Sequence, residues 1–424
     1  MGLTVFTISL VALIALGMPI VFSMIVASWA YALASGVALT VVAQKMVTGL
    51  ESFTLLAVPL FMLSAEAMNN TSVTRRLFDF ANKLVGRFPG GIGHVNVFTS
   101  MIFAGMSGSA VADTCGIGYV CLTEMDKRGF GMPFSTAVTA ASSTIGPIIP
   151  PSIPMVVYAV VAGASVGKLF LGGAIPGVLM GVTQMIYIYC ISLKRGYAAE
   201  KRSTWREKLI ATRNAVLPLL TPVILLGGIY GGVFTPTEAA AVAVLYALCL
   251  GAVYGDLNLR KLGEISVRVL LSAGIIMSIV AAANLFSWVM AAEQVPQRVG
   301  AMFLSVTNTR VGLLFMLNIV FLILGAIMDI NTILLVFVPM VLPAVTAMGI
   351  DLVHFGVIVV LNTMIGLLTP PYGMNLFILS GLTGLTINQI LKELWPFIIM
   401  LVGLLFLITY VEPIVMWLPN LLVK

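Results

Sequence analysis

The fold of this 424-residue chain is decided by two stretches, Ser142-Ser143-Thr144-Ile145-Gly146-Pro147-Ile148-Ile149-Pro150-Pro151 and Asn362-Thr363-Met364-Ile365-Gly366-Leu367-Leu368-Thr369-Pro370-Pro371. Each lies inside a long apolar segment, 134–163 or 353–383. Two adjacent prolines remove two backbone donors and disfavour a helical conformation at the residue before them. Both segments are therefore predicted to be helices that break near their middle.

The amino-acid composition indicates that these helices lie in a membrane. Hydrophobic residues make up 60% of the chain and charged residues 9%, whereas a soluble domain carries roughly 25% charged residues. This excludes a soluble enzyme and a disordered chain, and we expect no nucleic-acid partner. The sequence predicts an all-α polytopic membrane protein in the lipid bilayer, because helices satisfy their own backbone groups there. A broken helix at membrane depth is tolerated where it is buried in protein or lines a polar cavity.

The two breaks belong to an internal repeat. Ile-Gly-x-x-x-Pro-Pro occurs at 145–151 and again at 365–371, 220 residues later. Upstream, Gly105 and Gly325 are separated by the same offset. Each glycine lies near a polar tip between two short apolar limbs, in 92–123 and 311–346. These segments are predicted to be re-entrant helical hairpins, so each half contains one hairpin and one broken helix.

Basic residues give the orientation of the halves. Cytoplasmic loops are enriched in Lys and Arg, so loop 71–90 and segment 193–213 are predicted to be cytoplasmic; the latter holds Lys194, Arg195, Lys201, Arg202, Arg206, Lys208 and Arg213. Counting crossings then places loop 293–310 outside. Equivalent loops lie on opposite sides, which predicts an inverted repeat, the architecture of secondary transporters. Residues 3–33 form one crossing or two, so the side of the N-terminus stays open.

In such proteins the site lies at the membrane midplane, where the repeats meet. Two equivalent tip-and-break units predict at least two Na⁺ sites. The first would use Ser107, Gly108, Ser142, Ser143 and Gly146, and the second Gly325, Met328, Asp329, Thr363, Gly366 and Thr369. The predicted substrate contacts are Ser107, Ser109, Asn331, Thr332, Asn362 and Asn375. The alternatives are helix packing for the small residues, interhelical hydrogen bonds for the amides, and N-caps for Asp113 and Asp329.

Four motifs together resemble a known family, the large membrane (permease) subunit of tripartite ATP-independent periplasmic (TRAP) transporters. They are Gly105-Met106-Ser107-Gly108-Ser109-Ala110-Val111-Ala112-Asp113, Ile148-Ile149-Pro150-Pro151-Ser152, Gly232-Val233-Phe234-Thr235-Pro236-Thr237-Glu238-Ala239-Ala240 and Leu368-Thr369-Pro370-Pro371. The resemblance implies a Na⁺ symporter in a bacterial inner membrane. A periplasmic substrate-binding protein would deliver a small carboxylate such as sialic acid or a C4-dicarboxylate. A small four-helix membrane subunit would brace the chain.

The resemblance also implies an elevator mechanism, in which a transport domain moves against a scaffold. Scaffold helices and arms are then expected at 1–91 and 168–310, transport-domain repeats at 92–167 and 311–384, and a C-terminal helix at 385–424. The chain is not expected to be an enzyme, because no Ser-His or Asp-Asp pair suits catalysis. One alternative is a Na⁺/dicarboxylate carrier of a related family that works without a binding protein. Gly163–Lys168 imitates a phosphate-binding loop, but Leu169 replaces the required hydroxyl residue.

Overall fold

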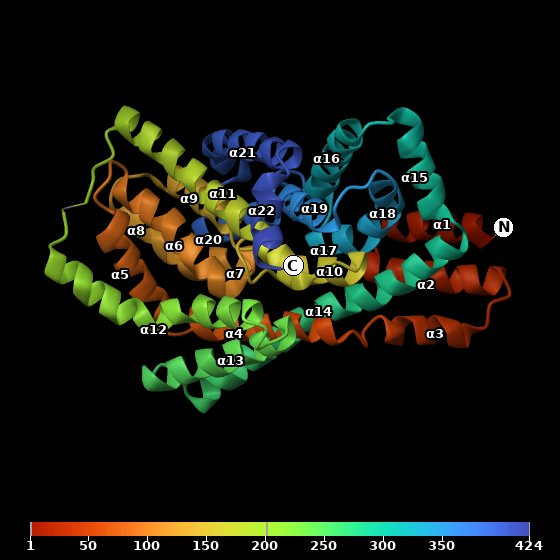
Figure 1. The fold of residues 1–424 in the computed structure, drawn as a ribbon, viewed down its shortest axis with the longest axis horizontal. Helices are drawn as coiled ribbons and strands as arrows, with labels where there is room; N and C mark the ends of the chain where they lie inside the picture. Colours follow the sequence, from red (N-terminus) through yellow and green to blue (C-terminus); the bar gives the residue numbers. More distant parts are fainter. Residues whose placement is uncertain (1, 201, 424) are drawn as a thin grey trace.

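The computed structural model describes residues 2–200 and 202–423, and over these residues the chain is built from helices without β-strands (Figure 1). Seven of the described helices are long and apolar enough to cross a membrane. An eighth span results if α3 (Leu39–Thr48) and the bent segment Phe53–Asn69, which meet at 56°, are counted as one. The predicted all-α membrane class is confirmed.

The first predicted hairpin is present. Helix α6 (Gly91–Ser107) runs to the polar tip, and the chain returns through α7 (Ala110–Asp113), the π-helical turn η2 (Thr114–Gly118) and α8 (Tyr119–Lys127). The first broken helix follows as α9 (Met132–Ser143) and α10 (Ile153–Ala162). The break between them spans the Pro-Pro pair.

The second half repeats this order of elements. Helix α16 (Arg310–Ile327) leads to the second tip, and α17 (Ile330–Thr332), the π-helical turn η3 (Ile333–Phe337) and α18 (Val338–Ala347) lead back. The second broken helix is α19 (Leu352–Gly366) and α20 (Met374–Thr383). Pro150-Pro151 and Pro370-Pro371 are both joined by cis peptide bonds. The correspondence therefore extends beyond the sequence motif to the π-helical turns and the peptide geometry.

The broken helices pack against each other in exchanged pairs. Helix α9 contacts α20, and α10 contacts α19. Asn375 on α20 donates a 2.9 Å hydrogen bond to the hydroxyl of Ser143 at the end of α9. At the other end, the hydroxyl of Tyr158 on α10 donates to the carbonyl of Leu352 on α19 over 2.7 Å. The first part of each broken helix thus packs on the second part of the other.

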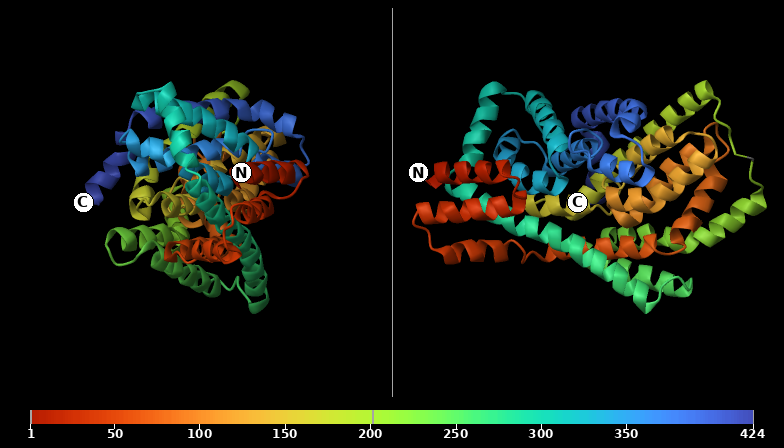
Figure 2. Two further views of the ribbon diagram at one scale, coloured as in Figure 1. Left: turned by 90° about the vertical axis from the view of Figure 1, so that its right-hand side faces the viewer. Right: turned by 180° about the vertical axis from the view of Figure 1, so that it is seen from behind.

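The remaining helices surround this pair of units (Figure 2). They are α1 (Gly2–Ala15), α2 (Ile20–Ala34), α3, η1 (Phe53–Leu56), α4 (Ala57–Asn69), α5 (Val73–Val85), α11 (Val166–Arg195), α12 (Trp205–Tyr230), α13 (Pro236–Val253), α14 (Leu259–Ala292), α15 (Val295–Val306), α21 (Ile387–Tyr410) and α22 (Pro413–Leu422). Residues 3–33 form two short helices, α1 and α2, that pack on each other.

The predicted loops 71–90 and 293–310 contain the short helices α5 and α15. They lie in opposite halves of the molecule (Figure 1). The α11–α12 connection, with its basic residues, lies at the same end as α5, whereas α15 lies at the other end (Figure 1). Helix α5 and the adjoining ends of α11 and α12 therefore lie at one end of the molecule and α15 at the other (Figure 1).

Candidate functional site

The tips of the two hairpins line one cavity of about 900 Å³. Helices α4 and α14 form much of the facing wall, with Glu66, Asn70 and Arg268 among its residues. The two tips are far apart along the chain, and the fold brings them together at this cavity. Predicted site residues that line the cavity are Ser107, Gly108, Ser109, Asp329, Asn331 and Thr332.

The first tip is shaped by a glycine and a serine. Gly108 ends α6 with a left-handed backbone (φ 60°), which favours glycine. A side chain there would collide with the carbonyl oxygen of Pro151. Ser109 caps α7 by accepting a 3.4 Å hydrogen bond from the backbone N–H of Ala112. The Ser107 hydroxyl is buried and has no hydrogen-bond partner among the described residues, so it remains able to bind a ligand in the cavity.

The second tip has a charged cap. Asp329 accepts a 2.8 Å hydrogen bond from the backbone N–H of Asn331, so the N-cap alternative for Asp329 is confirmed. For Asp113 that alternative is wrong, because Ser109 caps α7 and Asp113 lies at its end. The Asp113 carboxylate is fully buried, and neither oxygen has a hydrogen-bond partner within the described chain. It lies outside the residues that line the cavity.

Each tip is joined to its own break through the backbone. In the first unit, the N–H of Ile153 donates to the carbonyl of Gly108 over 3.3 Å. In the second unit, the N–H of Tyr372 donates to the carbonyl of Ala326 over 2.8 Å. These bonds bring each hairpin tip to the broken part of the following helix, as the predicted cation sites require.

At the first predicted cation site, two backbone carbonyl oxygens lie close to Gly146. A Cβ built on Gly146 would lie 3.3 Å from the carbonyl oxygens of both Ser109 and Ser143. One of these oxygens comes from the tip and the other from the end of α9. Carbonyl oxygens in an unwound segment suit a hard cation such as Na⁺. Glycine at 146 leaves the space beside them open.

The second predicted site is built on two glycines in contact. A Cβ on Gly325 would lie 3.1 Å from the Cα of Gly366 and 3.6 Å from the carbonyl oxygen of Asn362. The hydroxyls of Thr363 and Thr369 donate to carbonyls of α19, at 2.8 and 2.9 Å, and keep their lone pairs for another ligand. The site is thus more tightly packed than the first one.

Three predicted residues are placed elsewhere. Ser142 donates to the Oδ1 atom of Asn96 on α6 over 3.0 Å. Asn362 donates to the Oδ1 atom of Asn318 on α16 over 2.6 Å. Both are fully buried and absent from the cavity wall. Asn375 is bound to Ser143 and is also outside it. In this structure Ser142 and Asn362 join broken helices to hairpins, and Asn375 joins the two broken helices to each other.

Sequence reasoning missed the partners of these side chains and the charged wall of the cavity. Asn96 and Asn318 lie on the outer limbs of the two hairpins, and each bonds to the neighbouring broken helix. They are 222 residues apart, so the 220-residue repeat does not align them. Glu66 is an acid in an apolar helix, and its partner Arg268 lies on α14, far away in sequence.

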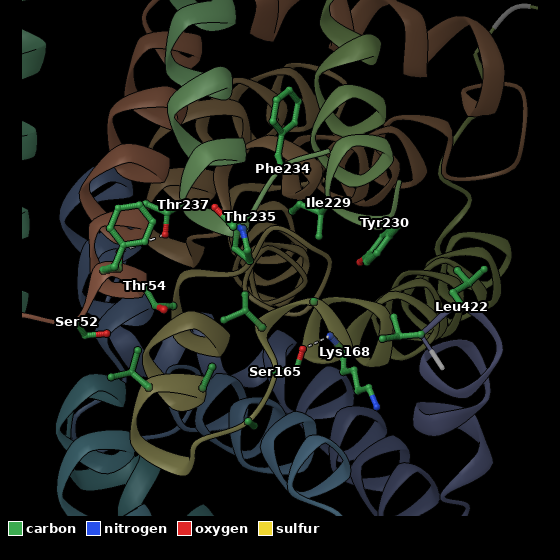
Figure 3. A pocket seen from close by; sticks show the side chains of 18 residues that line it. Ser52, Thr54, Ser165, Lys168, Ile229, Tyr230, Phe234, Thr235, Thr237 and Leu422 are labelled. Atoms are coloured by element: carbon green, nitrogen blue, oxygen red, sulfur yellow. Dashed lines mark hydrogen bonds between the residues drawn. The ribbon is translucent and has the colours of Figure 1, made fainter. Parts of the chain in front are cut away.

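A second cavity of about 740 Å³ lies between the α10–α11 and α12–α13 connections (Figure 3). Lys168 is on its wall, in the first turn of α11, where its backbone N–H donates to Ser165 over 3.3 Å. The preceding element is helix α10 and not a strand, so the phosphate-loop likeness lacks its structural context. Thr235 and Glu238 form a capping box at the start of α13, as a first-turn acid predicts.

Comparisons with known proteins identify the family of the chain. The family model "Tripartite ATP-independent periplasmic transporter, DctM component" matches residues 7–414. The chain is 41% identical to the sialic acid TRAP transporter large permease protein SiaM of Vibrio cholerae, over 96% of this chain and 95% of that protein. It is 39% identical to the C4-dicarboxylate TRAP transporter large permease protein DctM of Pseudomonas aeruginosa, over 89% of each.

A solved structure shares the fold. The YdaH transporter of Alcanivorax borkumensis superposes with a TM-score of 0.62 at 12% identity, over 88% of this chain and 87% of that one. The helical membrane architecture is therefore found in another transporter. The family match spans nearly the whole chain, and the relatives are permease subunits and not enzymes. The chain is thus a member of the DctM family, the large permease component of TRAP transporters.

Proposed function

We propose that this large permease imports a small carboxylate together with Na⁺ across the bacterial inner membrane. The observation that carries the proposal is the single cavity lined by both hairpin tips. Hydroxyl and amide groups of Ser107, Ser109, Asn331 and Thr332 face it and can donate to a carboxylate. Sialic acid and C4-dicarboxylates are the favoured solutes, because relatives named for them cover most of this chain.

In the proposed mechanism, Na⁺ binds where each tip meets its break. The carbonyls near Gly146 would bind Na⁺ at the first site. The second site would lie where Gly325 approaches Gly366 and would also use Asp329. Cation binding holds each tip against its broken helix and so fixes the hydroxyls and amides that bind the solute. Because solute binding then depends on bound Na⁺, the Na⁺ gradient drives accumulation.

The exchanged packing of α9 with α20 and α10 with α19 supports an inverted repeat that moves as one transport domain. We assign 92–167 and 311–384 to this domain and the segments 1–91 and 168–310 to the scaffold. Helices α5 and α15, at opposite ends of the molecule, would act as the connecting arms (Figure 1). Movement of the domain past α4 and α14 would carry the cavity between the two sides of the membrane.

Reconstitution tests the proposal. This chain, together with its small membrane subunit, is placed in proteoliposomes, and the binding protein is added outside with radiolabelled sialic acid or succinate. We expect accumulation when a Na⁺ gradient points inward and when the binding protein is present. Accumulation that is unchanged after Na⁺ is replaced by choline would reject Na⁺ coupling.

The same assay separates the alternative function. A Na⁺/dicarboxylate carrier of a related family would take up solute at full rate without the binding protein. Uptake that falls to background when the binding protein is omitted supports the three-part transporter. Full uptake in its absence supports the carrier.

A further inference from the structure

The wall of the cavity opposite the tips carries a charged cluster that the proposed tip site does not use. Arg268 on α14 places its Nε atom 3.0 Å from a carboxylate oxygen of Glu66 on α4. Its Nη2 atom donates a 3.2 Å hydrogen bond to the Oδ1 atom of Asn70. Asn70 in turn donates to the Glu66 carboxylate over 3.3 Å. All three residues line the cavity.

The guanidinium of Arg268 keeps unused binding capacity. It has five N–H groups: one on Nη2 donates to Asn70, and Nε forms an ion pair with the Glu66 carboxylate. No other acceptor bonds it in the described parts of the chain, and 54% of its side chain is exposed. The free N–H groups on Nη1 and Nη2 are at the end of the guanidinium. That edge matches the two oxygens of a carboxylate.

The charges that line the cavity distinguish the Arg268 guanidinium from the other lining groups. Among the described residues on its wall, Arg268 alone is basic, and the acids are Glu66 and Asp329. Asp329 is held at the tip by its backbone hydrogen bond. An anionic solute therefore meets a single cation in the cavity. Glu66 weakens the electrostatic attraction between Arg268 and an anionic solute, because the two opposite charges of the pair nearly cancel at a distance.

The position of the cluster gives its stage in transport. Arg268 follows Arg260 and Lys261 in the first turns of α14, and Glu66 lies near the end of α4, just before the basic loop 71–90. Loop 71–90 is predicted to be cytoplasmic by its charge, and the same rule predicts this for the basic start of α14. The cluster is thus on the cytoplasmic side of the tips, on the scaffold helices that the proposed transport domain passes.

We propose that Arg268, oriented by Glu66 and Asn70, forms a second carboxylate-binding site that receives the solute between the hairpin tips and the cytoplasm. This inference rests on the proposed function. The Glu66 carboxylate keeps the site weak, so that the solute is passed on to water and not retained. The pair is partly exposed, and exposed ion pairs contribute little to stability, so a solute carboxylate can approach Arg268 without a large loss.

The experiment measures exchange of the solute from the cytoplasmic side. Proteoliposomes containing the complex are loaded with a range of unlabelled sialic acid or succinate, with equal Na⁺ on both sides. Labelled solute and binding protein are added outside. The binding protein selects the molecules whose periplasmic face points outward, so the internal concentration acts on the cytoplasmic face. The half-saturating internal concentration is the readout.

We expect Arg268→Gln to raise this concentration about tenfold, without changing the half-saturating Na⁺ concentration. Glu66→Gln should act in the opposite direction, lowering both the half-saturating concentration and the maximal rate, because the uncompensated guanidinium holds the solute. Arg268→Lys keeps the charge and should recover part of the loss. The matched control is Arg260→Gln, which removes an exposed pair with Glu264 (3.2 Å) on the same helix.

The inference is overturned if Arg268→Gln and Glu66→Gln both remain within twofold of wild type, or if both shift in the same direction. Because exchange is measured at equal Na⁺, it stays readable if wild type shows no Na⁺-driven accumulation, a result that would reject only the coupling in the proposed function. If Arg268→Gln melts far below wild type, the Glu66→Gln variant alone tests the inference, because tighter solute binding by that variant cannot result from unfolding. Absence of exchange in wild type would reject both proposals.

Discussion

Replacement of Gly366 by alanine should weaken Na⁺ binding strongly. A Cβ on Gly366 would lie 2.5 Å from both the Cα and the carbonyl oxygen of Gly325, closer than carbon and backbone atoms approach in folded proteins. The backbone of the second tip must therefore move away by about an ångström to restore ordinary contact. Overpacking of this kind costs about 1–3 kcal/mol. If the cost falls on the Na⁺-bound arrangement, Na⁺ affinity falls by about 5- to 150-fold.

The assay is solute uptake into proteoliposomes as a function of external Na⁺, with the melting temperature measured in parallel. Gly325→Ala should have a smaller effect, because its Cβ would lie 3.1 Å from the nearest atom, the Cα of Gly366. Gly403→Ala on α21 is the matched control, since nothing lies within 4 Å of its Cβ position. A Gly366→Ala protein with the half-saturating Na⁺ concentration of wild type would refute the placement of the second site at this contact.

Three further predictions concern the polar groups around the sites. Asp329→Asn retains a capping oxygen but removes the charge, so it should raise the half-saturating Na⁺ concentration in the uptake assay with little change in melting temperature. Ser143→Ala leaves the buried amide of Asn375 without its 2.9 Å acceptor and should lower the unfolding free energy by about 1–3 kcal/mol, measured by denaturation in detergent; an unchanged value would contradict that role. Asn318→Ala and Asn362→Ala should be strongly non-additive in the same measurement, because the 2.6 Å hydrogen bond between these residues is lost in either variant.

The breaks and tips were predictable because proline and glycine act on the backbone locally. The doubled Pro-Pro motif predicted the ends of α9 and α19, and the polar tips predicted where α6 and α16 end. The elements and their order in each half therefore follow from the sequence. Cavity residues at the tips, such as Ser107 and Asn331, follow for the same reason, since they are next to the glycine or the cap that turns the chain.

The direction of side chains within the helices was not predictable in the same way. Asn362 sits beside a break, yet its amide bonds to Asn318 and is closed off from the cavity. Which face of α19 meets α16 depends on the packing of the whole helix, and a single polar residue does not reveal it. Likewise, Arg268 and Glu66 meet only because α14 and α4 run side by side.

The hydrogen bond from Asn375 to Ser143 has a consequence for the fidelity of energy conversion. It joins the end of α9 to the start of α20, and the Tyr158–Leu352 bond joins α10 to the start of α19. In the proposed mechanism neither half can then cross the membrane while the other stays behind. A half-loaded carrier would have to move as a whole or remain still, which protects the cell against a futile leak of Na⁺.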